Sequence, residues 1–318
     1  MAARTESEGG MSAHDTAIDT RAGARAGIEP EGRKPRRISP GRIGIYAFLI
    51  MAAVFFLVPL YVMIVTSLKT MPEIRLGLLF NLPKEPTIQP WIDAMVNACT
   101  GLDCHGLSPG FWNSVKITVP SVIVSIICAS LNGYALTYWP YKGANLLFAL
   151  LVFGAFVPYQ VVIYPLIIGL SWAGLFATLP GIIIIHTIFG MPLLTLLYRN
   201  FYASLPVELF KAARVDGAGF WRIFFMIMMP MSVPITIVAV ILQVTGIWND
   251  FLFGVVFAGR ENWPMTVQLN NIVNSTTGVR EYNINMAATI LTAAVPLIVY
   301  FVSGRWFVRG IAAGAVKG

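Results

Sequence analysis

Charged residues are scarce in this sequence. Only 12% of its 318 residues are charged, against about a quarter in a typical soluble domain. So little charge cannot cover the surface of a water-soluble particle of this size, which excludes most soluble globular classes. Because 57% of the residues are hydrophobic and the mean hydropathy is +0.72, the composition predicts a membrane protein.

Catalytic and metal-binding motifs are also lacking. There is no G-x-x-x-x-G-K-[ST] phosphate loop, no H-E-x-x-H and no Cys/His cluster with metal-ligand spacing. The three histidines cannot be paired with a nucleophile from the sequence. His186 is interpreted as a packing residue, because no carboxylate accompanies it in its apolar run. We therefore expect no enzymatic activity, no ATPase site, no metal and no cofactor in this chain.

Long apolar runs, in contrast, are abundant. A hydrocarbon core of about 30 Å takes about 20 helical residues to cross. Six stretches reach that length, and prolines inside them are tolerated because neighbouring helices satisfy the freed carbonyls. The six are Ile43–Thr66, Ser114–Tyr138, Ala144–Leu170, Leu179–Phe201, Ser232–Phe257 and Ile284–Val308. The sequence therefore predicts an all-α integral membrane protein with six transmembrane helices, built from residues 42–318.

The segment before the first span, residues 1–41, is rich in Gly, Ala and charge and is predicted to be a disordered tail. The first apolar run is too long and too far along the chain for a secretory signal, so it is interpreted as a retained span. Sixteen Lys and Arg fall on the side of both termini and six on the other. The positive-inside rule then places both termini in the cytoplasm. The net charge of +7 reflects this bias, so we expect no nucleic-acid partner.

Two longer loops, about Ser67–Asn113 and Ala258–Asn283, lie on the outer side of this topology. Cys99 and Cys104 in the first loop either form a disulfide in an oxidising periplasm or stay as two free thiols. Cys128 lies within a span and is expected to be a small packing residue.

Ionisable residues are nearly absent from the middle of the spans. Proton- and sodium-driven transporters usually keep such residues there, because they are costly in lipid and persist for function. Asp250 is the exception, and it lies towards the outer end of the fifth span. An ion-coupled mechanism is therefore disfavoured, although neutral backbone sites for sodium stay open.

The cytoplasmic segment between the fourth and fifth spans, residues 204–230, reads as two short helices. Ser204 is the expected N-cap of the first helix, with Pro206 in its first turn. Asp216–Gly217 is a turn signal that ends this helix, and a second helix starts near Phe220 and runs towards Pro230. The segment is either an amphipathic connector in the lipid headgroups or a docking surface for another protein.

The stretch "KAARVDGAGFWRIFFMIMMP" in this segment closely resembles the EAA-x3-G-x9-I-x-L-P signature of membrane subunits in binding-protein-dependent ABC importers. The matching positions are Ala212, Ala213, Gly217, Ile227 and Pro230. A mild departure is Met229 in place of the usual Leu. Lys211 stands where the signature has Glu, so any ion pair of that carboxylate would need a compensating acidic residue on the partner.

Three further stretches extend the resemblance over most of residues 42–318. "NSVKITV" at Asn113–Val119 is similar to the start of the family's transport core, and "WNDFLFG" at Trp248–Gly254 to its fifth-span "WN-x-F" element. The end, "RWFVRGIAAGAVKG", resembles the tail of the maltose-type carbohydrate branch. Within that branch, "IVNSTTGVREYNINMAAT" is most similar to glucose/mannose permeases.

The resemblance implies a type I ABC importer permease fold in the bacterial inner membrane. Such a subunit moves a mono- or oligosaccharide, driven by ATP hydrolysis in a separate subunit that holds the ATP and Mg. The implied partners are a second permease subunit, two copies of the ATP-binding subunit, a periplasmic sugar-binding protein, the sugar and the lipid bilayer. The alternatives are a self-sufficient secondary transporter or channel, or an ABC permease for a non-sugar solute.

The resemblance also implies which residues carry the coupling. The cytoplasmic segment would seat in a groove of one ATPase, and the C-terminal tail, residues 309–318, would reach into the ATPase dimer. The expected coupling residues are Glu208, Lys211, Ala212, Ala213, Asp216, Gly217 and Pro230. The expected contacts of the tail are Gly310, Gly314 and Lys317.

A candidate substrate path is suggested by polar and aromatic residues that crowd the fifth span. Sugar recognition needs hydrogen-bonding groups beside an aromatic face. The candidates are Gln243, Trp248, Asn249 and Asp250. Because Gln243 and Asn249 are about 600° apart around a helix, they do not share a face. Some of these residues must therefore pack against neighbouring helices, as Asn and Gln commonly do in membranes.

Overall fold

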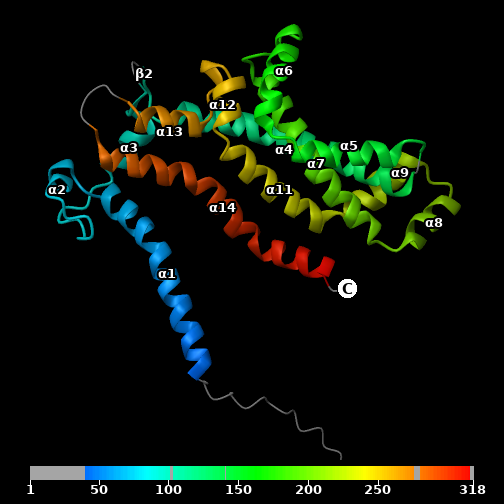
Figure 1. The fold of residues 1–318 in the computed structure, drawn as a ribbon, viewed down its shortest axis with the longest axis horizontal. Coiled ribbons are helices and arrows are strands. Elements are labelled where there is room, and N and C mark those ends of the chain that lie inside the picture. The colour runs from blue at the N-terminus through cyan, green and yellow to red at the C-terminus, as the bar shows by residue number, and fades with distance from the viewer. Residues whose placement is uncertain (1–39, 101–102, 140, 276–279, 316–318) are drawn as a thin grey trace, which may run out of the picture. The chain divides into compact units, whose positions relative to one another are not determined.

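The computed structural model describes residues 40–100, 103–139, 141–275 and 280–315, which are largely helical (Figure 1). The described residues divide into two units between Phe56 and Leu57. In chain order the elements are α1 (Pro40–Ser67), α2 (Met71–Arg75), α3 (Gln89–Val96), β1 (Cys99–Thr100), β2 (Asp103–Cys104), α4 (Ser108–Tyr138), α5 (Ala144–Phe156), α6 (Tyr159–Trp172), α7 (Leu179–Ala203), α8 (Val207–Val215), α9 (Phe220–Ile223), the π-helix η1 (Phe224–Met228), α10 (Met229–Met231), α11 (Val233–Trp248), α12 (Leu252–Phe257), the 3₁₀ turn η2 (Arg260–Asn262), α13 (Met265–Val273) and α14 (Tyr282–Ala315).

Among the described residues, four helices are long and apolar enough to cross a membrane: α1, α4, α7 and the part of α14 from Tyr282 to Gly304. Two further helix pairs pass the same test but are sharply bent. One pair is α5 and α6, bent by 108°, and the other is Phe220–Met231 and α11, bent by 76°. The expected six spans are reached if each bent pair counts as one.

The bend between α5 and α6 departs from the single helix expected over Ala144–Leu170. Val157 has an extended backbone (φ −70°, ψ 123°), and Pro158 is the N-cap of α6. A proline disfavours the α conformation of the residue before it, which ends α5 at Phe156. Pro165 lies inside α6 without breaking it. Figure 1 shows α6 turned away from the line of α5.

The expected span Ser232–Phe257 is also interrupted, and α11 ends at Trp248. The Asp250 carboxylate accepts hydrogen bonds from the backbone N–H groups of Phe253 (3.3 Å) and Gly254 (3.0 Å). These are donors of the first turn of α12, whose N-cap is Phe251. The Asp250 side chain thus stabilises the start of a new helix where a continuous one was expected.

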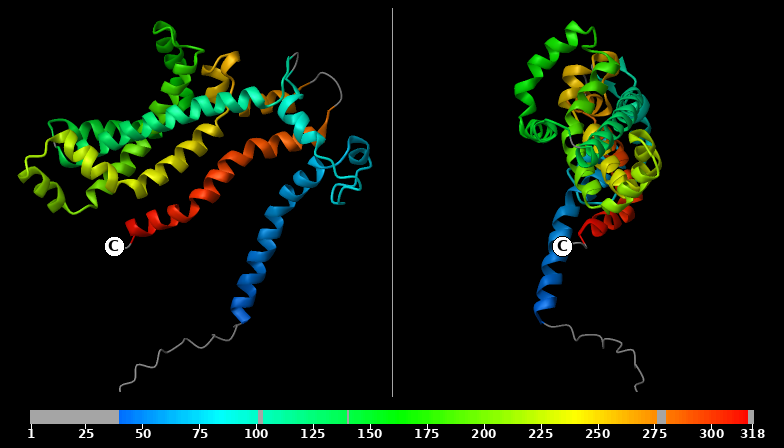
Figure 2. Two further views of the ribbon diagram at one scale, coloured as in Figure 1. Left: turned by 180° about the vertical axis from the view of Figure 1, so that it is seen from behind. Right: turned by 90° about the vertical axis from the view of Figure 1, so that its right-hand side faces the viewer.

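The core of the membrane domain is the packing of α4 against α7, which lie side by side in Figures 1 and 2. Gly133 makes this close approach possible, because a Cβ at that position would lie 2.8 Å from the Tyr198 Cβ and the Arg199 backbone nitrogen. The Ser130 and Tyr202 hydroxyls share a buried hydrogen bond of 2.7 Å across the same interface. Buried residues of α6, α8, α9, α11, α12 and the π-helix η1 extend this apolar cluster.

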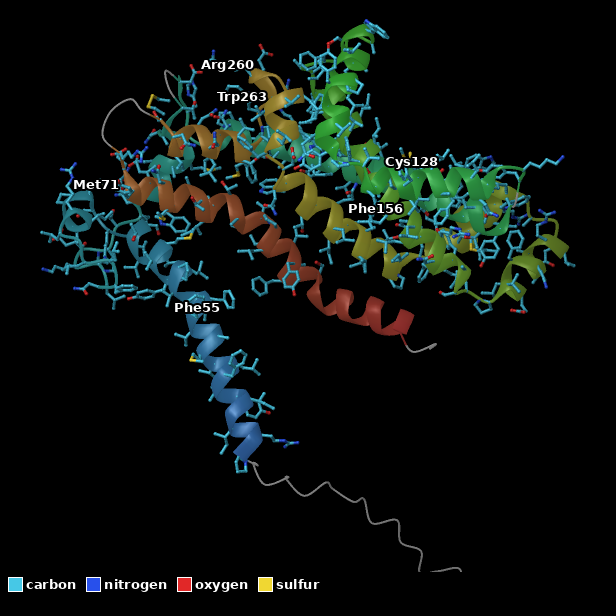
Figure 3. The ribbon with its side chains drawn as sticks, viewed as in Figure 1. Phe55, Met71, Cys128, Phe156, Arg260 and Trp263 are labelled. Carbon is cyan, nitrogen blue, oxygen red and sulfur yellow. A yellow bond between two sulfur atoms is a disulfide. The ribbon has the colours of Figure 1, made fainter. Side chains whose placement is uncertain are left out.

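Before the N-terminal end of α4 lies a hairpin in which β1 and β2 pair antiparallel. Cys99 and Cys104 face each other in this pairing and form a disulfide, which decides between the two alternatives for these cysteines. Arg260, labelled in Figure 3, binds the Asp103 carboxylate at 2.7 Å and joins the hairpin to η2. Cys128 is a half-buried free thiol on α4.

The ends of the chain are described only in part. Of the predicted disordered tail, residues 1–39 lie outside the described residues, and Pro40 and Gly41 already belong to α1. The tail predicted from residue 309 continues α14 as helix to Ala315. Gly310 and Gly314 lie in this last part of α14, and Lys317 lies outside the described residues.

Candidate functional site

The segment predicted to lie in the cytoplasm and to couple to an ATPase folds as helix, turn and helix. Its first helix, α8, starts after Pro206, which is the N-cap. Ser204 does not cap α8 as expected. It is the C-cap of α7, and its hydroxyl donates to the Phe201 carbonyl at 2.7 Å. Glu208 in the first turn and Arg214 in the last turn of α8 complement the helix dipole.

The turn after α8 is a Schellman motif. Gly217 N–H donates to the Arg214 carbonyl (3.1 Å), and Ala218 N–H donates to the Ala213 carbonyl (3.0 Å). Gly217 has φ +77°, a conformation that L side chains rarely adopt. A Cβ at Gly217 would meet open space within this chain. The glycine is therefore required for its backbone conformation and not for close packing within the chain.

One face of α8 rests on aromatic residues at the end of α4, which we call the aromatic ledge (Tyr134, Tyr138 and Trp139). The Phe210 ring stacks on Tyr138 with centroids 4.7 Å apart and meets Trp139 edge-on at 5.8 Å. The Arg214 guanidinium lies 4.5 Å above the Trp139 ring, a cation–π contact. The ledge thus holds one face of α8 through contacts with Phe210 and Arg214.

The ledge also holds the start of the second helix. Phe220 of α9 lies 4.8 Å from the Tyr134 ring, and its carbonyl accepts a hydrogen bond from the Tyr134 hydroxyl at 3.2 Å. The Trp139 indole donates to that same hydroxyl at 2.7 Å. Both helices of the segment are therefore fixed to one end of one span.

The opposite face of α8 is exposed. Val215 is 87% exposed and Leu209 42%, and Ala212, Glu208 and Lys211 are exposed beside them. Leu209, Ala212 and Ala213 have the i, i+3, i+4 spacing of one apolar helix face, but of the three only Ala213 is buried. A cavity of about 190 Å³ opens beside the turn. Its lining residues are Ala213, Asp216, Ala218, Arg222, Met226 and Ile227.

Pro230 lies where the segment turns into α11. The helix from Phe220 changes to π geometry over Phe224–Met228 and bends by 76° at Ser232. Pro230 and Pro234 lack the N–H that a regular helix would use here, which accounts for the irregular turn. The other sequence-predicted coupling residues are brought together on α8 and its turn, and Pro230 lies apart from them at this bend.

The candidate substrate path is not brought together as one site. Gln243 and Asp250 both face α7, where Gly190 adjoins the Gln243 amide and His186 adjoins the Asp250 carboxylate. The Gln243 amide is buried against Gly190, where a Cβ would collide with its Nε2. Asn249 is exposed, and its backbone N–H closes α11 by donating to the Thr245 carbonyl.

Trp248 faces away from this group, towards α14. Its indole N–H donates to the Thr292 carbonyl at 3.0 Å, and the residue is 2% exposed. In a regular helix that carbonyl would bond the N–H of residue 296, which is Pro296 and has none. Trp248 therefore satisfies a carbonyl that a proline leaves free. It packs α11 against α14 and does not face the other path candidates.

Sequence reasoning missed one partner of Asp250. The His186 Nε2 lies 3.9 Å from the Asp250 carboxylate, so the expectation that no carboxylate accompanies His186 is wrong. The two residues are 64 positions apart, and only the packing of α7 against the break after α11 brings them together. Phe253 lies edge-on to His186 at 5.7 Å and to Tyr159 of α6 at the same distance. Polar groups and aromatic rings thus meet around Asp250, as sugar recognition requires.

Within the described ranges, no three His, Cys, Asp or Glu side chains gather where they could hold a metal ion.

Comparison with known proteins identifies relatives along most of the chain. Residues 117–313 match the family described as "Binding-protein-dependent transport system inner membrane component". A probable ABC transporter permease protein of Pyrococcus horikoshii is 36% identical over 89% of this chain and 100% of its own length. The alpha-glucoside transport system permease protein AglG of Rhizobium meliloti is 38% identical over 68% of this chain and 58% of its own length.

A solved structure shares the fold. A chain of a bacterial ABC transporter involved in the import of the acidic polysaccharide alginate superposes with a TM-score of 0.69. The superposition covers 84% of this chain and 97% of that one, at 21% sequence identity.

We predict that the aromatic ledge determines how firmly α8 is held. Truncating a fully buried Phe costs about 3–5 kcal/mol. Because Phe210 is half-buried, Phe210→Ala should lower the free energy of local opening of α8 by about 1–3 kcal/mol. Hydrogen exchange of the α8 amides in the purified chain measures this opening. Leu209→Ala, on the exposed face of the same helix, is the matched control and should leave the exchange unchanged. Equal exchange in the two variants would contradict the role of the ledge.

Proposed function

The chain belongs to the family of binding-protein-dependent transport system inner membrane components, and from this membership we propose that it is a permease subunit of an ATP-driven sugar importer. The observation that carries the proposal is the segment from α8 to α10. The family signature falls on it, the aromatic ledge fixes one face, and the other face is exposed for a partner. A lipid-facing connector would not need this rigid attachment.

The exposed face of α8 would seat in a groove of an ATP-binding subunit, present in two copies. That subunit would hold the ATP and Mg, since this sequence has no phosphate loop of its own. A second permease subunit would form the other half of the pore, and a periplasmic binding protein would deliver the solute. The description of the family as binding-protein-dependent supports this set of partners.

The proposed cargo is a mono- or oligosaccharide, with glucose/mannose-type sugars as the first to test. Support comes from AglG, whose name gives alpha-glucoside transport, at 38% identity. It also comes from the aromatic rings and polar groups that meet around Asp250. Asn249, exposed beside Asp250, is the residue with the most freedom to bind a sugar hydroxyl.

The proposed orientation places both termini, and α8, in the cytoplasm. The disulfide hairpin precedes the N-terminal end of α4, and the aromatic ledge lies at its C-terminal end. Helix α8 and the hairpin therefore lie at opposite ends of this 31-residue helix. A disulfide persists in an oxidising compartment such as the periplasm. The hairpin and the distribution of Lys and Arg therefore support the same orientation.

The proposal is tested by purifying the tagged chain gently from its own membranes. We expect an ATP-binding subunit and a second permease to accompany it, and the reconstituted complex to import sugar only with ATP and the binding protein. The substitutions Ala212→Trp and Gly217→Trp together should release the ATP-binding subunit, since both positions are exposed. A lone chain that moves solute after reconstitution would contradict the proposal and favour a self-sufficient transporter. A complex that transports another solute but no sugar would contradict only the proposed cargo and would leave the importer function standing.

Three substitutions at Gly217 separate the shape of the turn from contact with the ATPase. Gly217→Ala strains the left-handed backbone by about 1–2 kcal/mol, whereas Asn tolerates it better. If the turn shape alone matters, Gly217→Asn keeps ATP-driven uptake and Gly217→Ala reduces it. If the ATPase packs against this position, Gly217→Asn and Gly217→Asp also abolish uptake, although the chain inserts normally. We expect the second result, measured as uptake per complex alongside ATPase activity. Normal uptake by Gly217→Asp would reject coupling through this turn.

Asn249 and Trp248 are neighbours with different expected roles. Asn249→Ala should remove about one hydrogen bond to the sugar, about 1 kcal/mol, and raise the KM of uptake roughly fivefold. Trp248→Phe should instead lower the amount of folded complex, because the Thr292 carbonyl loses its donor. Uptake kinetics and the yield of complex distinguish the two effects. An unchanged KM for every transported sugar in Asn249→Ala would remove it from the substrate path.

A further inference from the structure

The loop between α2 and α3 is strongly apolar, although it is not a helix. We call residues 76–82, "LGLLFNL", the apolar loop. Its large side chains are between 46% and 70% exposed, namely Leu76, Leu78, Leu79, Phe80 and Leu82. A surface in water rarely exposes such a continuous apolar run, so this loop needs a covering.

Two hydrogen bonds fold the apolar loop back against the end of α1. The Tyr61 hydroxyl donates to the Phe80 carbonyl at 2.7 Å. The Lys69 ammonium, only 2% exposed, donates to the Leu78 carbonyl at 2.7 Å. Figure 1 shows the loop beside the C-terminal end of α1, below α2.

The bond to Tyr61 fixes the depth of the loop. Tyr61 lies six residues before Ser67, where α1 ends, which is about 9 Å along the helix axis. Phe80 is therefore level with the last turns of α1 and does not lie beyond them. Because α1 is a membrane span by length and composition, the loop reaches the depth at which that span leaves the bilayer.

The surface of α1 at this level is itself apolar and exposed, with Leu57, Leu60 and Ile64 between 42% and 57% exposed. The exposed side chains of the apolar loop lie next to this surface of α1 and enlarge it. Tyrosine is enriched at the interface between hydrocarbon and water, and Tyr61 is the residue that joins the loop to the span. The covering is therefore expected to be the one that α1 already requires, which is lipid.

The polar ends of the loop agree with this depth. Exposed Arg75 precedes it and exposed Lys84 and Glu85 follow it, so charge appears where the chain leaves the apolar run. Irregular backbone is excluded from the hydrocarbon centre, because its polar groups would be unsatisfied there. In the headgroup region water satisfies them, and apolar side chains can still reach the acyl chains.

We propose that the apolar loop is a membrane-interface anchor, which inserts Leu79 and Phe80 among the lipids of the leaflet at the C-terminal end of α1. In the proposed orientation this is the outer leaflet. The anchor sets the depth of α1 in the bilayer. The inference requires only that α1 spans the membrane, and it is independent of the cargo.

The test uses the assembled transporter in nanodiscs whose phosphatidylcholine carries a doxyl quencher near the headgroup. A single NBD fluorophore is attached through Phe80→Cys in a Cys128→Ser background, with the Cys99–Cys104 disulfide left intact. Tyr61 binds the backbone carbonyl of Phe80, so this substitution keeps the hydrogen bond. Lys84→Cys, exposed in the same loop, is the matched control. If Phe80→Cys does not assemble, Leu79→Cys replaces it.

We expect blue-shifted emission and quenching by the doxyl lipid at position 80, and neither effect at position 84. Equal quenching at the two positions would overturn the anchor. Quenching in the isolated chain that disappears in the assembled transporter would also overturn it, and would assign this surface to the second permease. ATP-driven uptake is measured with the same labelled transporter reconstituted into sealed liposomes, because a nanodisc encloses no compartment. Lost quenching with uptake intact therefore rejects the anchor alone and leaves the proposed function standing.

Discussion

The segment from α8 to α10 depends on the aromatic ledge at the end of α4. Helix α8 has nine residues, and isolated helices shorter than about 12–15 residues are marginal in water. Its position is therefore set by tertiary contacts, chiefly the stacking of Phe210 on Tyr138 and the contact of Arg214 with Trp139. Because the ledge belongs to a long membrane helix, any force on α8 passes directly into α4.

From α4 the same rigid connection continues into α7. The close approach at Gly133 leaves no space for the two helices to slide freely, and the Tyr138 hydroxyl donates to the Tyr202 carbonyl at 2.8 Å. Further along α7 lies His186, which faces Asp250 at the break between α11 and α12. One helix thus contacts the ledge at one end and the candidate substrate path at the other.

Local signals in the sequence predicted local structure well. The Asp216–Gly217 turn, the helix start at Phe220 and the apolar spans all follow from neighbouring residues, and the structure has them. The breaks at Pro158 and Asp250 were missed, because apolar composition alone does not show where a helix ends inside a span. The ledge and the pairing of His186 with Asp250 could not be predicted, since each joins segments more than 60 positions apart.

Lys211 lacks an acidic counter-charge among the described residues of this chain. It lies on the exposed face of α8 and makes no ion pair with the described residues. Among the described residues, none therefore compensates for the lysine that stands where the family signature has glutamate. A groove that buries this ammonium without a counter-charge would lose several kcal/mol by desolvation. In the proposed complex, an ATP-binding subunit that accepts α8 would either leave Lys211 at the rim in water or offer it a carboxylate. The second arrangement would exclude subunits built for a glutamate at this position.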